Sequence, residues 1–381
     1  MSRAVRAGGR RVAVAMSLVA TLVACTAAKS PAPAPVTWTK VDVGPAEPVT
    51  LTAHDNQLLV GLRHRGAQVV PELQLLDATG KRTSIPVKPN PASPYAFEAI
   101  WYSIAYDGKQ LLALGGAAGG AHSNTRWTVW TGSPQTGLVE HPQDFFTFGG
   151  QTAGDLYSAV ITPDGRALLG SWGGVQTGND AMVWLPQGSD AKWTRQNPAK
   201  TALQSTPSLL VGPGFGTTLG ERIVLAGSQV RLAPGVVAQE AAVWWSTKLN
   251  QGWSRIVLPD PGNRSQANTA TCSKDCVISG YVDDQLALWR LDASGTAKRL
   301  QGVPSIPVGD KDKLPPPLVN GDTIVQVVAQ GNKVKLVSGQ DGHWTVQDST
   351  GPAGPVINAA LLPDHKLYLI AGATLWQTTL S

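Results

Sequence analysis

Short apolar segments alternate with polar turns along most of this chain. Four clear copies of the apolar segment begin at Leu58, Leu111, Ala167 and Leu367. Each follows a tight turn that contains Asp, for example Asp107-Gly108. Asp-Gly and Asp-Asn pairs tolerate positive φ and favour tight hairpins. The pattern therefore predicts repeated β-hairpins rather than helices.

Three looser copies bring the number of apolar strands to seven. They begin at residues 58, 111, 167, 222, 276, 323 and 367, so each copy advances by 44 to 56 residues. A third strand is predicted after each copy, at residues 72–76, 126–131, 181–185, 241–246, 287–291, 334–338 and 374–378. A fourth strand follows in six units, at residues 83–87, 138–141, 193–196, 253–258, 296–300 and 344–347. A period near fifty residues is typical of blades that repeat around an axis.

The seventh unit ends without a fourth strand, whereas residues 37–41 near the N-terminus form a strand without a unit. This strand carries Trp38-Thr39, and the predicted fourth strands carry the same pair at Trp193-Thr194 and Trp344-Thr345. Blades in a closed ring leave only short, protected edges. We therefore predict an all-β, seven-bladed β-propeller of four-stranded blades over residues 36–381, closed by the N-terminal strand completing the last blade.

The first 24 residues read as an export signal. Four Arg between residues 3 and 11 precede an apolar run at residues 12–23, which is too short to span a membrane. Cys25 follows Leu22-Val23-Ala24, and this segment resembles the lipobox of bacterial lipoproteins. The resemblance implies a signal peptide at residues 1–24 and a lipid on Cys25 that anchors the protein outside the cytoplasm on a bacterial membrane. A secreted protein with a chance Cys is the alternative, and Arg10-Arg11 also admits twin-Arg export.

Residues 25–35 contain three Pro alternating with Ala, a composition that stays extended and forms no core. They are predicted to be the lipidated Cys and a tether. Removal of the signal leaves 27 basic and 26 acidic side chains, so the net charge of +5 belongs mostly to the signal. The mature chain lacks the basic surface that nucleic acids require, and we expect no nucleic-acid partner. We expect a monomer.

The other two cysteines, Cys272 and Cys276, lie in a predicted hairpin turn of an exported chain, where a disulfide persists. A zinc site would need two more ligands nearby, and no His lies between His141 and His343. The sequence has no Gly-rich phosphate loop and no His-Glu-x-x-His motif. We expect a disulfide, no metal and no cofactor.

The segment from Ser338 to Trp344 resembles a degenerate Asp-box of sialidase-type propellers, with Asp341 one place late. Residues 246–253 form a poorer copy that lacks the Asp. The resemblance covers two of seven blades and implies the fold more than the activity, because the catalytic residues of sialidases cannot be matched in this sequence.

The connections between second and third strands are predicted to be long in the first four units, and long connections are often functional. We therefore expect the ligand on the face over blades 1 to 4. The candidate ligand-binding residues are Arg63, His64, Arg65, Trp101, Tyr102, His122, Tyr157 and Trp172. The alternative to ligand binding for Trp101 and Trp172 is packing between blades. For residues 63–65 the alternative is a solvated cluster of charges. The other eleven Trp lie at repeat positions and are assigned to the framework.

Glu98 and Asp155 are the acids near the start of first strands on these blades, and they are weak catalytic candidates. Two carboxylates across a channel could hydrolyse a glycoside, with their spacing deciding the stereochemistry. The sequence favours a membrane-anchored, extracytoplasmic binding or assembly module for a carbohydrate, an envelope polymer or a protein. A sialidase-like glycoside hydrolase, or another propeller enzyme with its site at the channel mouth, is the alternative. Convergent carboxylates at the mouth would favour an enzyme, and an aromatic rim would favour binding.

Overall fold

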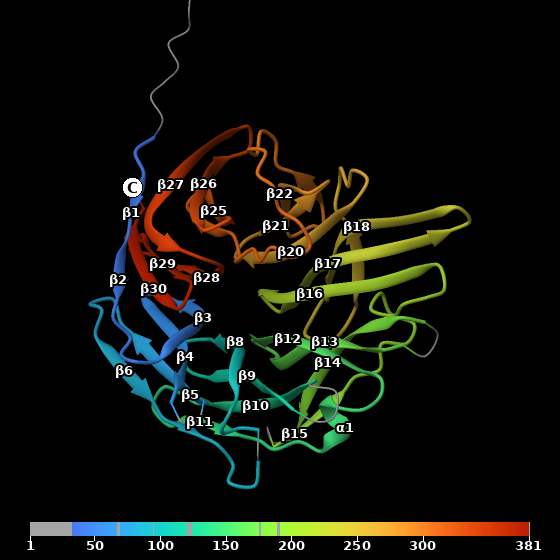
Figure 1. Ribbon diagram of the computed structural model, residues 1–381. Helices are drawn as coiled ribbons and strands as arrows, with labels where there is room; N and C mark the ends of the chain where they lie inside the picture. The colour runs from blue at the N-terminus through green and yellow to red at the C-terminus, as the bar shows by residue number, and fades with distance from the viewer. Residues whose placement is uncertain are drawn as a thin grey trace, which may run out of the picture. The chain divides into compact units, whose positions relative to one another are not determined.

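Seven sheets follow one another around a ring, and the four strands of each blade pair antiparallel (Figure 1). The strands of a blade are consecutive in the chain in all but the last blade. The computed structural model describes residues 33–66, 69–93, 95–119, 124–174, 177–188 and 191–380. In every sheet the first strand faces the centre of the ring and the fourth lies outside. The predicted seven-bladed β-propeller is therefore confirmed.

The first three blades contain the strands that carry most of the candidate site. Blade 1 consists of β3 (Glu47–His54), β4 (Gln57–Arg65), β5 (Val69–Leu76) and β6 (Arg82–Ile85). Blade 2 consists of β8 (Ile100–Tyr106), β9 (Leu111–Ala118), β10 (Thr125–Ser133) and β11 (Gly137–Glu140). Blade 3 consists of β12 (Ala153–Thr162), β13 (Gly165–Gly173), β14 (Asn179–Gln187) and β15 (Lys192–Arg195), and it is preceded by the short helix α1 (Phe145–Phe148).

The other four blades complete the ring. Blade 4 consists of β16 (Leu209–Leu219), β17 (Arg222–Ala233), β18 (Val236–Trp245) and β19 (Ser254–Val257). Blade 5 consists of β20 (Ser265–Cys272), β21 (Cys276–Val282), β22 (Gln285–Leu291) and β23 (Ala297–Arg299). Blade 6 consists of β24 (Leu318–Asn320), β25 (Thr323–Gln330), β26 (Lys333–Gln340) and β27 (His343–Ala353). Blade 7 consists of β28 (Val356–Leu361), β29 (Lys366–Ala371), β30 (Thr374–Thr379) and, from the other end of the chain, β2 (Thr39–Val41).

The two ends of the chain close the ring, as predicted. Strand β2 pairs antiparallel with β30, and Thr39 lies opposite Gln377 (Figure 1). Trp38 is only 5% exposed and packs into the apolar cluster between blades 6 and 7. The N-terminal segment thus supplies both backbone hydrogen bonds and a buried indole to the last blade.

Two short strands bind parallel to the outer edge of a blade, which the sequence did not predict. β1 (Val36–Thr37) pairs with β27 of blade 6, and β7 (Val87–Lys88) pairs with β11 of blade 2. The predicted fourth strand at residues 83–87 therefore ends early, at Ile85. Pro86 lacks an N–H to donate, so the ladder stops there and the chain crosses to the next blade.

A β-bulge interrupts the first strand of six blades at the same place. In the second strand, a glycine lies opposite the bulge in blades 1 to 5, at Gly61, Gly115, Gly170, Gly227 and Gly280. A Cβ atom on Gly280 would lie 1.9 Å from the carbonyl oxygen of Gln266. The glycines let the two strands approach where the bulge bends the inner strand toward its neighbour.

Apolar clusters lie between neighbouring blades rather than within one central core. The third strands of blades 2 to 5 each bury one Trp completely, and these residues are Trp130, Trp184, Trp244 and Trp289. Large aromatic side chains contribute most to such packing. The assignment of these four Trp to the framework agrees with their burial.

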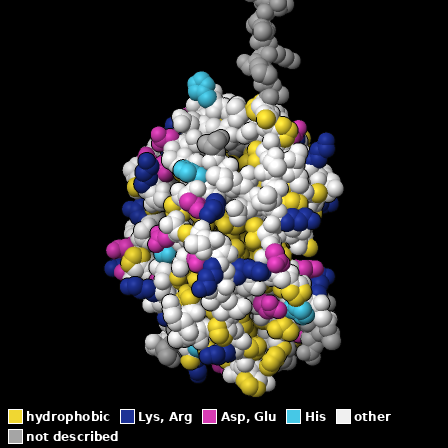
Figure 2. All heavy atoms as spheres, turned by 90° about the vertical axis from the view of Figure 1, so that its left-hand side faces the viewer, with side chains coloured by type: hydrophobic (Ala, Val, Ile, Leu, Met, Phe, Trp, Pro, Cys, Tyr) yellow, Lys and Arg dark blue, Asp and Glu magenta, His cyan; other side chains and the backbone are white. Residues whose placement is uncertain are grey.

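Cys272 and Cys276 form a disulfide across the turn between β20 and β21, which confirms the predicted bridge. No helix among the residues that the structure describes has the length and apolarity needed to cross a membrane. Basic and acidic side chains are interspersed over the outer side of the ring around β1, β2 and β6 (Figure 2).

Candidate functional site

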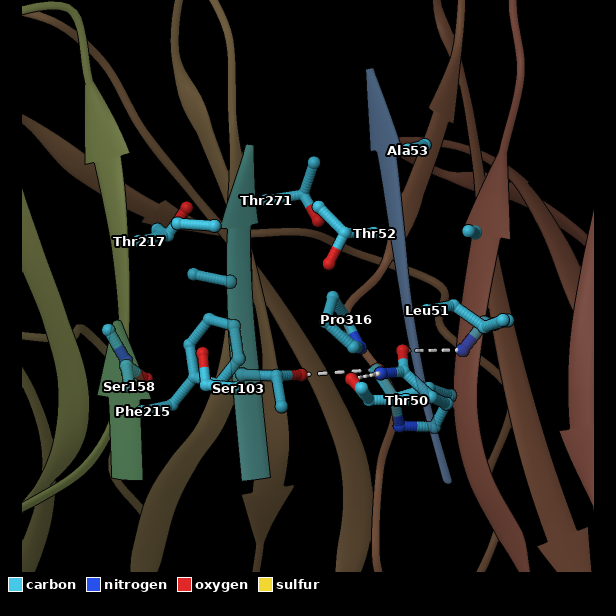
Figure 3. Close-up of a pocket in the computed structure, with 18 of the residues that line it drawn as sticks. Thr50, Leu51, Thr52, Ala53, Ser103, Ser158, Phe215, Thr217, Thr271 and Pro316 are labelled. Atoms are coloured by element: carbon cyan, nitrogen blue, oxygen red, sulfur yellow. Dashed lines mark hydrogen bonds between the residues drawn. The ribbon is translucent and has the colours of Figure 1, made fainter. Parts of the chain in front are cut away.

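The first strands of all seven blades line a central channel with a volume of about 840 Å³. Hydroxyl-bearing side chains point into it, and Figure 3 shows Thr52, Thr217 and Thr271 facing the same space. Phe215, Tyr102 and Tyr157 add aromatic surface. None of the described residues that line the channel is an Asp, Glu, Lys, Arg or His. The channel can therefore form hydrogen bonds but offers no charge.

Side chains at or beside the bulges tie one blade to the next around this channel. Ser103 and Ser158 occupy equivalent positions in blades 2 and 3, and each hydroxyl oxygen accepts a backbone N–H from the next blade. The bonds between neighbouring blades are Thr52 Oγ1 to Ile104 O (2.6 Å), Ala159 N to Ser103 Oγ (3.0 Å), Gly216 N to Ser158 Oγ (2.8 Å), Thr269 Oγ1 to Pro315 O (3.2 Å) and Asn358 Nδ2 to Thr50 Oγ1 (3.3 Å). These contacts hold the channel wall in place, because buried donors and acceptors are costly to leave unpaired.

A second cavity, of about 250 Å³, lies beside blade 2. Its walls come from residues 92, 93 and 95, from β10 and from the segment 140–149 that leads into blade 3. We call it the blade 2 pocket. Its aromatic lining residues are Tyr95, Trp127, Phe145 and Phe148, and its ionisable or amide side chains are Arg126, Glu140, Gln143 and Asp144. Aromatic walls combined with a few convergent polar groups are typical of a ligand site.

The segment that forms one wall of the pocket is fixed by contacts with blade 3. The Trp184 indole donates to the carbonyl oxygen of Thr147 at 2.8 Å, and its ring lies 6.0 Å from that of Phe148. Gln143 accepts from the backbone N–H of Trp193 at 2.9 Å. Helix α1 is thus held in place on the ring, with Phe148 buried and Phe145 and Phe146 exposed.

All four exposed aromatic side chains of the described residues lie between residues 97 and 146. They are Phe97, Tyr102, Phe145 and Phe146, which are 43%, 49%, 54% and 77% exposed. Strand β8 and the segments before and after blade 2 carry them. Exposed aromatics collected in one sector of a surface, rather than scattered singly, indicate a binding site.

One aromatic pair joins the two cavities. Tyr102 lines the channel, Trp127 lines the blade 2 pocket, and their rings meet edge to face at 4.7 Å between centroids. Tyr102 is among the predicted ligand-binding residues, and the residue is 49% exposed. The repeat pattern places Trp127 in the framework. Trp130 is the residue of this strand that corresponds to the buried Trp of the other blades, and Trp127 lies three residues before it, opposite Gly116. This offset is the sequence signal that could have set Trp127 apart.

The charged side chains of the pocket differ in whether other groups of the protein already bind them. The Arg126 guanidinium lies 5.1 Å from the centre of the Phe145 ring, and no ion pair links it to any described carboxylate. Burial raises the pKa of Glu140, although its carboxylate accepts hydrogen bonds from Ser93 Oγ at 2.7 Å and from the Asn90 backbone at 2.9 Å. Glu140 therefore fixes the connection before blade 2, and Arg126 is the group free to meet a ligand.

The predicted cluster at residues 63–65 is neutralised within blade 1. Arg63 and Arg65 both donate to the same oxygen of Glu47, at 2.9 and 2.8 Å. His64 lies 3.6 Å from a carboxylate oxygen of Glu72. These side chains form a salt-bridge network at the end of a hairpin, and their charge is already balanced by acids from the same sheet.

Both predicted ligand-binding Trp are packing residues instead. Trp101 is 3% exposed, and its indole donates to the carbonyl oxygen of Glu72 in blade 1 at 2.8 Å. Trp172 is 8% exposed, with the Arg195 guanidinium 3.7 Å from its ring centre. The expectation that they face a ligand is corrected, because a side chain enclosed between blades has no surface left for one.

The remaining candidates divide between the channel and the surface. Tyr157 lines the channel but donates its hydroxyl to the carbonyl oxygen of Gly170 at 2.9 Å, and burial raises its pKa. Glu98 and Asp155 are exposed, and neither lines the channel. The structure therefore does not bring these two acids together in the cavity. His122 and Cys25 lie outside the described residues.

The predicted long connections are largely extensions of the strands themselves. Strands β4 and β5 remain paired as far as Arg65 and Val69, and β17 and β18 as far as Ala233 and Val236. The β17–β18 hairpin extends outward from the ring (Figure 1). The strands predicted here are too short because polar residues replace apolar ones once a hairpin leaves the core.

Comparison with known proteins bears on the fold. No protein-family model matches the sequence, and no curated protein matches it. The structure is similar to virginiamycin B lyase from Staphylococcus aureus, with a TM-score of 0.57 and 12% identity over 90% of this chain and 98% of that one. A streptogramin B lyase gives a TM-score of 0.54 and 11% identity over 89% and 96% of the two chains. Hydrazine synthase from Kuenenia stuttgartiensis gives 0.53 and 13% over 94% and 99%. At these identities the comparisons support one conclusion about this chain, that it is a β-propeller.

Proposed function

We propose that this protein is an extracytoplasmic binding module, anchored by a lipid on Cys25, that holds a carbohydrate polymer of the cell envelope on the face of blade 2. The observation that carries the proposal is the aromatic sector around the blade 2 pocket, where Phe145 and Trp127 line a cavity of about 250 Å³. Aromatic rings at a binding surface supply large contact areas at low conformational cost.

Carbohydrate suits this sector better than a purely apolar ligand does. A sugar ring presents C–H groups on its faces and hydroxyl groups at its edge. The faces can stack on Tyr95, Trp127 or Phe145, while Arg126 and Asp144 can bond the hydroxyls. Water-accessible polar groups between aromatic walls orient such a ligand without requiring it to be apolar.

A glycoside hydrolase is less well supported than a binding module. Its usual chemistry needs two carboxyl groups on opposite sides of the scissile bond. The channel lining contains no described carboxylate, and the two predicted acids lie outside it. The blade 2 pocket has two carboxylates, but that of Glu140 already accepts hydrogen bonds from Ser93 and Asn90, which leaves one. The Asp-box resemblance adds no catalytic group, because Asp341 bonds the backbone N–H of Gln301 at 2.6 Å and the Lys298 ammonium at 3.0 Å. Its role is to join blades 5 and 6.

Retention on insoluble envelope polysaccharide tests the proposed function. We expect the protein without its signal and lipid to co-sediment with purified bacterial sacculi, and Phe145→Ala to weaken retention about tenfold, or about 1.4 kcal/mol. Val237→Ala is the matched control, because Val237 is 77% exposed but lies on the β17–β18 hairpin of blade 4. Equal retention of the two variants, at unchanged thermal stability, would contradict a site on blade 2.

The anchor has its own test. Cys25→Ser removes the thiol that carries the lipid, so we expect the protein to leave the membrane fraction or to stay unprocessed. Fractionation of cells that express each form, followed by mass measurement of the mature chain, checks this. A variant that matures and fractionates like the wild type would exclude lipid anchoring and leave carbohydrate binding untouched.

A further inference from the structure

The central channel has a chemical character that the blade 2 pocket does not share. Its described lining has hydroxyls and aromatic rings but no charged side chain, whereas the blade 2 pocket has both acids and a base. A charged group that entered the channel would lose water without meeting a counter-charge, which is costly. The channel therefore selects for neutral ligands.

Several hydroxyls of the channel wall keep a proton to donate. Ser103 and Ser158 accept backbone N–H groups through their oxygens, so each retains its own O–H for another partner. The hydroxyls of Thr217 and Thr271 bond no other described residue. Ser158 is only 2% exposed, so the hydroxyls of Ser103, Thr217 and Thr271 remain available, from blades 2, 4 and 5. They face one cavity of about 840 Å³, a volume typical of ligand sites.

A contact between two aromatic rings, those of Tyr102 and Trp127, links the lining of the channel to that of the blade 2 pocket. The half-exposed Tyr102 ring lines the channel, and the Trp127 ring that it touches lines the pocket. A ligand that contacts both rings would therefore extend from one cavity toward the other. A chain of sugar units held on the aromatic sector could cross Tyr102 and continue among the hydroxyls.

We infer that the ligand is an uncharged, linear oligosaccharide that lies on the blade 2 pocket, crosses Tyr102 and inserts one end into the central channel. The inference rests on the proposed function and names the substrate class of the same face. The aromatic sector binds the first sugar units. The channel accepts only an uncharged chain, and it contacts only a chain that is long enough to enter it.

The experiment is a calorimetric titration with oligomers of N-acetylglucosamine, from two to six units, and with glucosamine oligomers of the same lengths. N-Acetylglucosamine oligomers are neutral, whereas glucosamine oligomers carry one amine per unit. We expect the affinity for the neutral series to rise at least tenfold between the dimer and the hexamer. We expect the charged series to gain no affinity with length.

Two channel variants separate this inference from the proposed function. Thr217→Val and Thr271→Val remove a hydroxyl at nearly constant shape, and we expect each to weaken the hexamer three- to tenfold and to leave the dimer unchanged. Thr194→Val, on the outer strand β15, is the control. If Phe145→Ala abolishes binding of every oligomer while both channel variants match the wild type, the proposed function stands and the channel inference fails. Equal affinity for charged and neutral oligomers, or no gain of affinity with length, would also overturn the channel inference. If no oligomer binds at all, both the channel inference and the proposed function fail.

Discussion

Deletion of residues 36–43 is expected to destabilise the propeller by about 3 to 5 kcal/mol or more and to cause aggregation. The deletion removes Trp38, which is 5% exposed, and loss of a buried Trp alone has a cost of this size. It also removes β1 and β2, so β27 and β30 lose the strands on their outer sides. Unpaired strand edges pair readily with other chains.

Thermal unfolding and light scattering measure the two effects. Deletion of residues 26–32 is the control, because it shortens the predicted tether and keeps the segment that enters the ring. The control deletion stops at residue 32 because the carbonyl oxygen of Ala34 accepts a hydrogen bond from Gln347 Nε2 at 3.2 Å. Residue 34 is therefore already in contact with blade 6. If both deletions unfold at the wild-type temperature and stay monodisperse, the N-terminal strand does not hold the ring closed.

The second large effect is expected for Gly280→Ala. The new Cβ atom would lie 1.9 Å from the carbonyl oxygen of Gln266, which belongs to the backbone of the neighbouring strand and cannot rotate away. Relief requires separation of β20 from β21 at the bulge, and overpacking of this kind costs about 1 to 3 kcal/mol, or more when a backbone must move. We expect a loss at the upper end of this range.

Gly214→Ala is the matched control for this substitution. Gly214 also lies on a propeller strand, β16, but no heavy atom lies within 4 Å of the position that the new methyl group would occupy. We expect its free energy of unfolding in urea to stay within about 0.5 kcal/mol of the wild type. Two glycine variants of equal stability would mean that the close approach of the strands at the bulge has little energetic importance.

Most of the repeat architecture can be predicted because it depends on local patterns. The second strands are expected to begin at residues 58, 111, 167, 222, 276, 323 and 367, and they begin at 57, 111, 165, 222, 276, 323 and 366. Apolar runs bounded by Asp-containing turns mark these strands, since the second strand is buried on both faces. The N-terminal strand is recognisable because Trp38-Thr39 repeats the signature of other fourth strands.

The glycines opposite the bulges can be recognised in the sequence, although the prediction of the strands does not depend on them. Gly61, Gly170 and Gly280 each follow the apolar start of a second strand. An isolated glycine in a strand suggests a bulge or a close backbone approach. Alignment of the repeats on these glycines would have predicted the inner hydroxyl positions, such as Ser103 and Ser158, that line the channel.

The candidate site is harder to predict because it depends on contacts between segments far apart in the chain. The sequence assigns Trp101 to the ligand site and Trp127 to the framework, yet blade 1 encloses the first and the blade 2 pocket exposes part of the second. Likewise, the basic residues 63–65 give no sign that Glu47 would balance them from the adjacent strand. Exposure of one aromatic residue and burial of another are decided by packing, which a periodic pattern does not specify.

The most direct test of the binding site uses the indole N–H signals of the 13 Trp residues as reporters spread around the ring. We would titrate the ¹⁵N-labelled protein with the N-acetylglucosamine tetramer, with Trp127→Phe to assign the signal of the blade 2 pocket. Binding on blade 2 predicts that the Trp127 signal shifts first and furthest, while those of Trp289 and Trp376, in blades 5 and 7, stay in place. Saturable shifts confined to Trp in other blades, or no shift at all, would contradict a carbohydrate site on blade 2.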